Sequence, residues 1–195
     1  MQKIKEEIVK ISQRMYHEGL VAATSGNISC YDRASGKVAI TPSSIAYDDL
    51  TAESITVIDM NGNVVEGPYA PSSEWQMHLR VYEKMDDVNA VVHTHSTFAT
   101  AFAVIREPVD KILIEMDAYL GGAIPLAGFA EPGSIELGDA VVEGLQHNRT
   151  SCLLSNHGAL AVGEDLEDAY TKAVYVEDAA KIYYNARNIG TPVIL

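Results

Sequence analysis

The sequence has no long apolar run and few cysteines. No stretch approaches the roughly 20 consecutive apolar residues that a membrane-spanning helix needs, and residues 1–7 lack the apolar segment of a signal peptide. Cys30 and Cys152 are too isolated to form a disulfide framework, and neither belongs to a metal-binding cysteine pair. We therefore expect a cytoplasmic protein.

Basic residues are also scarce. The 195 residues include 14 Lys and Arg against 27 Asp and Glu, which gives a formal net charge of −13. Nucleic acids and anionic membranes are bound through basic patches, so neither is expected as the main partner. A small anionic substrate stays compatible with this charge, because a local site can oppose the overall balance.

The composition and the absence of repeats predict a single domain over residues 1–195. Hydrophobic residues make up 47% of the chain, which is enough to bury one core, and no low-complexity tract or linker divides it. Apolar spacings of three and four predict helices, and short apolar runs between turn residues predict strands. The expected helices cover residues 2–18, 72–85, 97–105, 134–145 and 166–186. The expected strands cover residues 37–40, 55–59, 63–66, 90–95, 111–116, 151–154 and 159–162, so the chain is of the mixed α/β class.

Two histidines stand at the end of the most apolar of these strands. In an extended chain, side chains two residues apart lie on the same face, so His93 and His95 are expected side by side. Neutral imidazole is a common zinc ligand, and a catalytic zinc has three protein ligands and one open position. The alternative is a histidine pair that bonds only to solvent or backbone.

Three further segments carry side chains suited to chemistry. His157 lies at a strand end beside a glycine, and Glu74 stands at a helix start behind two serines, where it either caps the helix or serves a site. Two hydroxyl-rich turns, at residues 24–29 and 41–44, are either ordinary turns or anion cradles with accessible backbone N–H groups. Together, three imidazoles, a carboxylate and phosphate-type donors form a coherent site for Lewis-acid chemistry on a phosphorylated sugar.

Five segments with family-like order and intervals carry a resemblance to known proteins. They are residues 24–27, 40–44, 71–75, 90–95 and 156–158. With these segments the chain resembles the class II aldolase/adducin family, and most closely its L-fuculose-1-phosphate aldolase branch. The resemblance implies a single three-layer α/β/α domain with a central, mainly antiparallel mixed sheet. It also implies a homotetramer with active sites at the subunit interfaces.

The resemblance assigns roles to individual residues. It implies one Zn²⁺ per subunit, held by His93, His95 and His157, with Glu74 as the catalytic acid/base that can occupy the open position on the metal. It implies a phosphate cradle formed by Thr24, Gly26, Asn27, Ser43, Ser44, Ser72 and Ser73. Related aldolases can use a tyrosine of a neighbouring subunit to protonate the leaving aldehyde. Glu115 stands at that place here, and Tyr119 follows four residues later.

The implied function is that of a zinc-dependent lyase. It would reversibly cleave a ketose 1-phosphate, L-fuculose 1-phosphate or a close analogue, into dihydroxyacetone phosphate and a small aldehyde through a metal-stabilised enediolate. A 5-deoxy- or 5-methylthio-pentulose 1-phosphate is such an analogue. Two alternatives are a pentulose 5-phosphate 4-epimerase and a non-catalytic, adducin-like interaction domain. The epimerase branch tends to carry Asp at Glu74 and a further histidine where Thr97 stands, and a scaffold has no physical need for the three histidines.

Three remaining histidines have no expected role in the site. His17, His78 and His147 are expected as exposed residues of helices or loops. His78 lies four positions after Glu74 and therefore on the same helix face, where a surface pairing or a bond to solvent would explain it.

Overall fold

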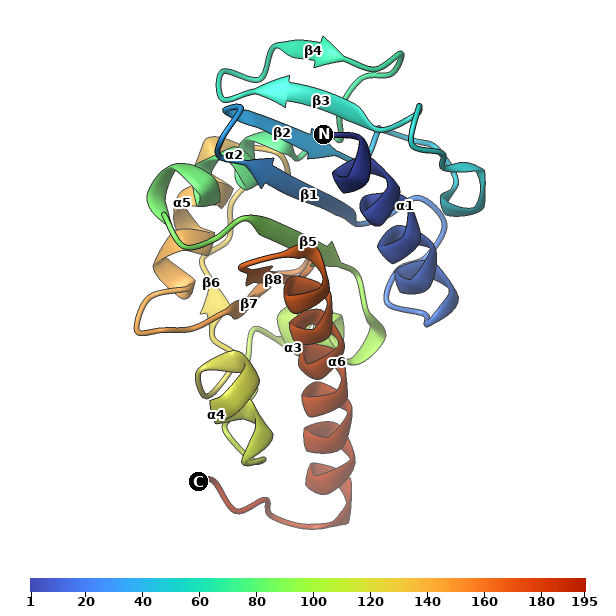
Figure 1. The fold of residues 1–195 in the computed structure, drawn as a ribbon. Helices are drawn as coiled ribbons and strands as arrows, with labels where there is room; N and C mark the ends of the chain where they lie inside the picture. Colours follow the sequence, from blue (N-terminus) through green and yellow to red (C-terminus); the bar gives the residue numbers. More distant parts are fainter.

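The computed structural model describes all 195 residues and shows one eight-stranded sheet between two layers of helices (Figure 1). The strands are β1 (Asn27–Asp32), β2 (Lys37–Ile40), β3 (Thr56–Asp59), β4 (Val64–Glu66), β5 (Ala90–Thr94), β6 (Leu126–Ala127), β7 (Ser151–Leu154) and β8 (Gly158–Gly163). Their order in the sheet is β4-β3-β2-β1-β5-β8-β7-β6. Only β6 and β7 pair in parallel, and every other neighbouring pair is antiparallel.

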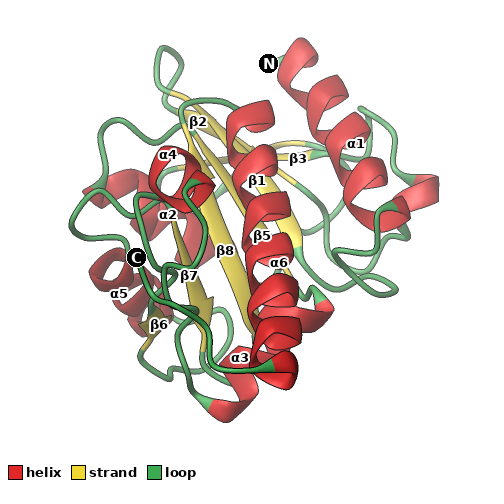
Figure 2. Cartoon of the chain, turned by 90° about the horizontal axis from the view of Figure 1, so that it is seen from below, coloured by secondary structure: helices red, strands yellow, loops and turns green.

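Helices cover both faces of the sheet. They are α1 (Gln2–His17), α2 (Trp75–Lys84), α3 (Thr97–Ile105), α4 (Glu115–Leu120), α5 (Ile135–Gly144) and α6 (Leu166–Ile189), with a short 3-10 helix at Tyr47–Asp49. In Figure 2, α6 lies along the sheet on the near face, with α1 and α3 beside it, while α2 and α5 lie on the far side. The predicted three-layer α/β/α architecture with a mainly antiparallel mixed sheet is therefore confirmed.

The alternation of side chains along the central strands divides the core between the two faces. On β5, Val92 packs in the cluster that contains α1 and the first half of α6, whereas Val91 packs in the cluster that contains α2 and α5. All five residues of β5 are buried. The most apolar predicted strand is thus the buried centre of the sheet, as expected for a strand covered on both faces. None of the helices combines the length and the apolar character required to cross a membrane.

Two sequence-based expectations are wrong at the level of single elements. Residues 111–116 do not form a strand, because residues 111–113 are irregular and α4 begins at Glu115. A short apolar run cannot be assigned to strand or helix by periodicity alone, and here Ile114 is exposed rather than buried in a sheet. Conversely, the sequence places residues 27–29 within a turn, but they open β1 in the middle of the sheet.

Candidate metal and sugar-phosphate site

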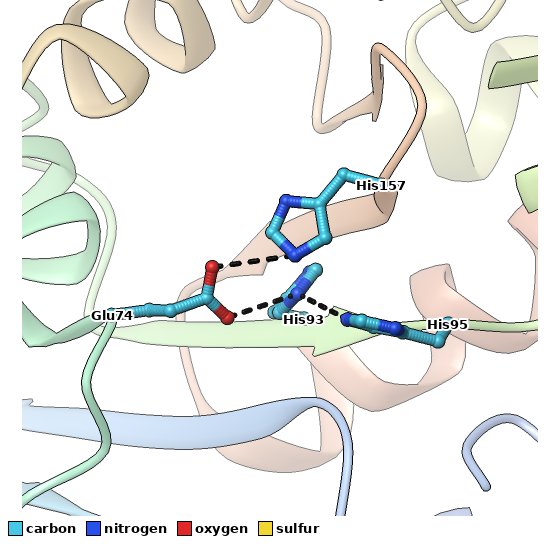
Figure 3. Close-up of side chains that lie close together, drawn as sticks. All are labelled: Glu74, His93, His95 and His157. Carbon is cyan, nitrogen blue, oxygen red and sulfur yellow. Dashed lines mark hydrogen bonds and ion pairs between the residues drawn. The ribbon is translucent and has the colours of Figure 1, made fainter. Parts of the chain in front are cut away.

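Neighbouring strands bring the distant site segments together. β5 pairs with β8 so that Thr94 lies opposite Ala159, which places the end of β5 beside His157, the residue before β8. On its other side β5 pairs with β1, and His93 lies directly opposite Asn27. Glu74 occupies the N-cap position of α2, which covers this face of the sheet. Figure 3 shows Glu74 and the three histidines directed toward one another.

The four side chains are spaced for a single metal ion. One ligand atom from each of Glu74, His93, His95 and His157 lies within 4.8 Å of all the others. The Nε2 atoms of His93 and His95 are 3.0 Å apart, and Glu74 Oε2 is 3.1 Å from His93 Nε2. Ligands about 2.0–2.1 Å from a tetrahedral zinc ion lie roughly 3.3 Å apart. The separations are therefore close to those of a coordinated set.

The histidines present the chemical form that binds metals. His93 Nδ1 donates a hydrogen bond of 2.9 Å to the carbonyl oxygen of Ala159, which leaves the Nε2 lone pair directed at the shared point. Burial, followed by the nearby His93, lowers the pKa of His95 to about 4 and also lowers the pKa of His157. Both rings are therefore neutral near pH 7, as metal coordination requires.

Glu74 is a buried carboxylate that does not cap its helix. Its side chain makes no capping hydrogen bond, and its backbone N–H donates to Ser72 Oγ at 3.3 Å. Burial raises the pKa of Glu74, but the neighbouring His93, together with Asn27 and His157, outweighs this effect and lowers the pKa. Glu74 Oε1 is buried and has no hydrogen-bond partner. A buried, unpartnered carboxylate oxygen beside three imidazoles fits a metal or a proton better than it fits a cap.

A polar cavity of about 280 Å³ adjoins these side chains. Its lining includes all seven residues assigned to the phosphate cradle, together with Glu74, His95 and His157, and the structure adds Ser25, Pro42 and Pro132. Gly26 has a φ of +77°, and a side chain there would come within 2.7 Å of the carbonyl oxygen of His93. Glycine is thus required for the 24–27 turn to approach the histidine strand closely.

Asn27 differs from the other cradle residues because its side chain is already engaged. Its Nδ2 donates to Glu74 Oε2 at 2.8 Å, and its Oδ1 lies 2.5 Å from His78 Nε2.

The expectation that His78 is exposed is wrong, because the ring is completely buried, whereas His17 and His147 are exposed as expected. The spacing of four between Glu74 and His78 indicated a shared helix face, and that face turns toward β1 rather than toward solvent.

Glu115 and Tyr119 are not brought to this cavity by their own chain. Both lie on α4, both are exposed, and neither lines the cavity. The Tyr119 ring instead stacks on Tyr175 of α6, with ring centroids 4.1 Å apart.

Comparison with known proteins defines the family. Residues 6–184 match the family described as Class II Aldolase and Adducin N-terminal domain. The chain belongs to this family. It is similar to the 5-deoxy-D-ribulose 1-phosphate aldolase of Bacillus thuringiensis serovar kurstaki, with 39% identity over 197 residues, covering 100% of this chain and 91% of that protein.

Solved structures of class II aldolases share the whole fold. An L-fuculose 1-phosphate aldolase superposes with a TM-score of 0.94 at 40% identity, covering 99% of this chain and 90% of that one. The L-fuculose-1-phosphate aldolase of Thermus thermophilus superposes with a TM-score of 0.82 at 25% identity, and each chain is covered completely. Class II aldolases are metal-dependent lyases that act on sugar phosphates, and this family member has a three-histidine, one-carboxylate cluster that can hold the metal.

Proposed function

We propose that this class II aldolase is a zinc enzyme that reversibly cleaves a ketose 1-phosphate into dihydroxyacetone phosphate and a small aldehyde. The observation that carries the proposal is the position of the cluster. Three imidazoles and one carboxylate come within 4.8 Å of one another, and Glu74, His95 and His157 among them line a cavity that serine, threonine and glycine also line. Metal ligands and phosphate-type donors thus face the same space.

The donor set supports zinc as the metal. Three imidazole nitrogens and one carboxylate oxygen are a typical tetrahedral zinc set, and the carboxylate can yield its place to a substrate. We assign His93, His95 and His157 as the permanent ligands. When bound, zinc supplies a Lewis acid that stabilises negative charge developing on the substrate oxygens.

We assign proton transfer at carbon 3 of the substrate to Glu74. In the cleavage direction Glu74 delivers a proton to carbon 3 and releases dihydroxyacetone phosphate, and in the condensation direction it removes that proton. Oε2 is held by Asn27, whereas Oε1 has no hydrogen-bond partner. Oε1 is therefore the oxygen that is free to carry the proton.

The hydroxyl-rich turns orient the substrate. We assign phosphate binding to the backbone around Gly26 and to the hydroxyls of Thr24, Ser43, Ser44, Ser72 and Ser73, which line the cavity beside Glu74. The start of α2 adds the positive end of a helix dipole. Binding energy from the phosphate then fixes the reacting carbons next to the cluster.

We place the aldehyde side of the reaction at a subunit interface. Glu115 and Tyr119 are exposed on α4 and do not reach the cavity of their own chain. In a homotetramer, α4 of a neighbouring subunit would supply them to take up the proton of the carbon-4 hydroxyl when the bond between carbons 3 and 4 breaks, and to return it to the aldehyde oxygen in condensation. The substrates named for the two relatives near 40% identity, 5-deoxy-D-ribulose 1-phosphate and L-fuculose 1-phosphate, differ only on this side of the cleaved bond.

The test combines a substrate panel with metal analysis. Purified protein of measured zinc content is offered L-fuculose 1-phosphate, 5-deoxy-D-ribulose 1-phosphate and a 5-methylthio-pentulose 1-phosphate, and dihydroxyacetone phosphate is measured. We expect release from at least one of them. No release, with conversion of ribulose 5-phosphate into its 4-epimer instead, would overturn the aldolase assignment.

Two variants separate the roles within the cluster. Glu74→Gln is expected to keep zinc and to lose turnover by about 100-fold or more, because the amide cannot exchange the proton. His95→Ala is expected to lose both zinc and turnover. Equal zinc loss in the two variants would show that Glu74 is chiefly a ligand.

A further inference from the structure

A chain of buried side chains leads away from Glu74 into the core beneath α2. Asn27 bridges Glu74 and His78, at 2.8 Å and 2.5 Å respectively. The other ring nitrogen, His78 Nδ1, is 2.6 Å from Ser29 Oγ, which in turn is 2.6 Å from the hydroxyl of Tyr82. All five residues are buried, and none of His78, Ser29 and Tyr82 lines the cavity.

The Glu74 carboxylate at the end of this buried chain of side chains decides which group donates and which accepts in each of its hydrogen bonds. An ionised carboxylate can only accept hydrogen bonds, so the Asn27 amide must direct its NH₂ group at Glu74 and its oxygen at His78. His78 Nε2 must then carry the hydrogen, and Nδ1 must accept from the hydroxyl of Ser29. The Ser29 oxygen, having donated its own hydrogen, accepts from Tyr82.

We propose that His78 is a positioning residue for catalysis, which fixes the Asn27 amide and thereby aims the Glu74 carboxylate at the reacting carbon. The proposal rests on the function proposed above. It assigns Asn27 to Glu74 rather than to the phosphate, and it gives the buried histidine a task that packing does not supply.

The alternative arrangement of the amide shows what His78 prevents. If Asn27 turned over, its oxygen would face the Glu74 carboxylate and its NH₂ group would face the hydrogen on His78 Nε2. Both contacts would be repulsive, so the tautomer of His78 excludes the turned amide. With Oε2 fixed in this way, Oε1 keeps its direction toward His157, as Figure 3 shows.

A histidine is an unfavourable residue for merely filling this space. Burying a polar ring costs free energy unless its nitrogens are bonded, and an apolar side chain would pack beneath α2 without that cost. Burial also lowers the pKa of His78 to about 3, so the ring is neutral and has one donor and one acceptor nitrogen. Both are used, which is expected of a ring whose tautomer matters.

The experiment compares three variants on α2 in the zinc-loaded enzyme. His78→Leu removes both hydrogen bonds, His78→Gln keeps one donor and one acceptor at similar reach, and Leu79→Ala is a packing control from the apolar core beside it. For His78→Leu we expect kcat to fall about 10- to 100-fold, the range for losing a hydrogen bond to a charged group, because the bond from Asn27 to the Glu74 carboxylate is no longer held in place. KM and zinc content should change less than about threefold, because the cradle and the three histidines are untouched.

Rescue and a spectroscopic measurement distinguish positioning from general damage. His78→Gln should recover most of the lost kcat, and Leu79→Ala should lower the thermal midpoint while keeping kcat. In ¹⁵N NMR spectra of histidine-labelled protein, the signals that disappear in His78→Gln should show a protonated Nε2 and an unprotonated Nδ1.

Three results would overturn the proposal. They are wild-type kcat in His78→Leu, a His78→Gln variant as slow as His78→Leu, or a protonated Nδ1 on His78. Failure of the aldolase assignment gives a different result, since the wild-type protein would then release no dihydroxyacetone phosphate. In that case the ¹⁵N measurement alone decides whether the buried chain runs from Tyr82 to Glu74 as donor to acceptor.

Discussion

A methyl group added at Gly158 is expected to separate the three histidines that we propose as zinc ligands. Gly158 opens β8 directly after His157, and a Cβ atom there would overlap the carbonyl oxygen of Thr94. The same atom would lie 3.2 Å from the His93 ring and 3.3 Å from the His95 ring. Gly158→Ala therefore forces the start of β8 away from the end of β5, and His157 moves with it.

The size of this shift can be compared with what zinc tolerates. Relieving a carbon–oxygen overlap of this kind needs a displacement on the order of 1 Å, whereas zinc–nitrogen distances vary by only about 0.2 Å. We expect zinc affinity to fall by at least about 10- to 100-fold, the range for disturbing groups that orient ligands. The overpacking itself should cost about 1–3 kcal/mol of the free energy of unfolding.

The opposite end of β8 provides a matched control. A Cβ atom at Gly163 would overlap the backbone nitrogen of Ala169 and come within 2.8 Å of the Asp168 carboxylate. Gly163→Ala should thus lower the free energy of unfolding about as much as Gly158→Ala does, while its zinc affinity stays within about threefold of the wild type. Zinc affinity is measured by competition with a chromophoric chelator, and stability by urea unfolding. Wild-type zinc affinity in folded Gly158→Ala, or equal loss in both variants, would refute the reasoning.

Three further perturbations test other parts of the site. Burial lowers the pKa of His78 from 6.5 to about 3, so between these values the unfolded chain binds a proton that the folded chain does not, and stability must fall as the pH falls. At pH 4.5 this lowers the free energy of unfolding by about 2–3 kcal/mol relative to pH 7.5. Urea unfolding at the two pH values should show a smaller decrease for His78→Gln than for the wild type, and equal decreases would contradict the lowered pKa. Ser73→Ala should raise KM for the ketose 1-phosphate about tenfold with unchanged zinc content, and an unchanged KM in steady-state assays would remove Ser73 from the cradle. Tyr119→Phe should lower kcat about 100-fold if α4 serves a neighbouring subunit, and wild-type turnover would exclude this residue as the proton donor.

Most of the fold follows from patterns that are local in the sequence. Helix α3 and strand β2 have the predicted bounds, because the apolar spacing and the turn residues that define them lie within or beside them. The strand predicted at residues 111–116 is wrong because the apolar residues 112–114 alone do not indicate whether they pair with a sheet or lead into a helix. In the structure α4 begins at Glu115 and packs against α6 instead.

The candidate site was predictable where residue types were unusual for packing. Histidine pairs at strand ends and serine-rich turns have little use in a core, so the sequence singles out the residues that line the cavity. His78 could not be recognised in this way. A lone histidine on an amphipathic helix is ordinary, and its role depends on the rotation of α2 that turns it toward Asn27 and Ser29, which is a tertiary property.

The polar residues of β1 explain why the sequence analysis missed this strand, and the same residues contact the candidate site. Ile28 and Cys30 face the cluster containing α1, while Asn27 and Ser29 face α2, so the strand alternates normally but half of it looks like a turn. A slip of one residue between β1 and β5 would move Asn27 and Ser29 to the other face. Ile28 would then meet Glu74, and the hydrogen bonds from Asn27 to both Glu74 and His78 would be lost. The register that places Asn27 opposite His93 therefore brings the Asn27 amide within reach of both Glu74 and His78. Polar residues are required on this face of β1 for that reason, and they are also what made the strand look like a turn.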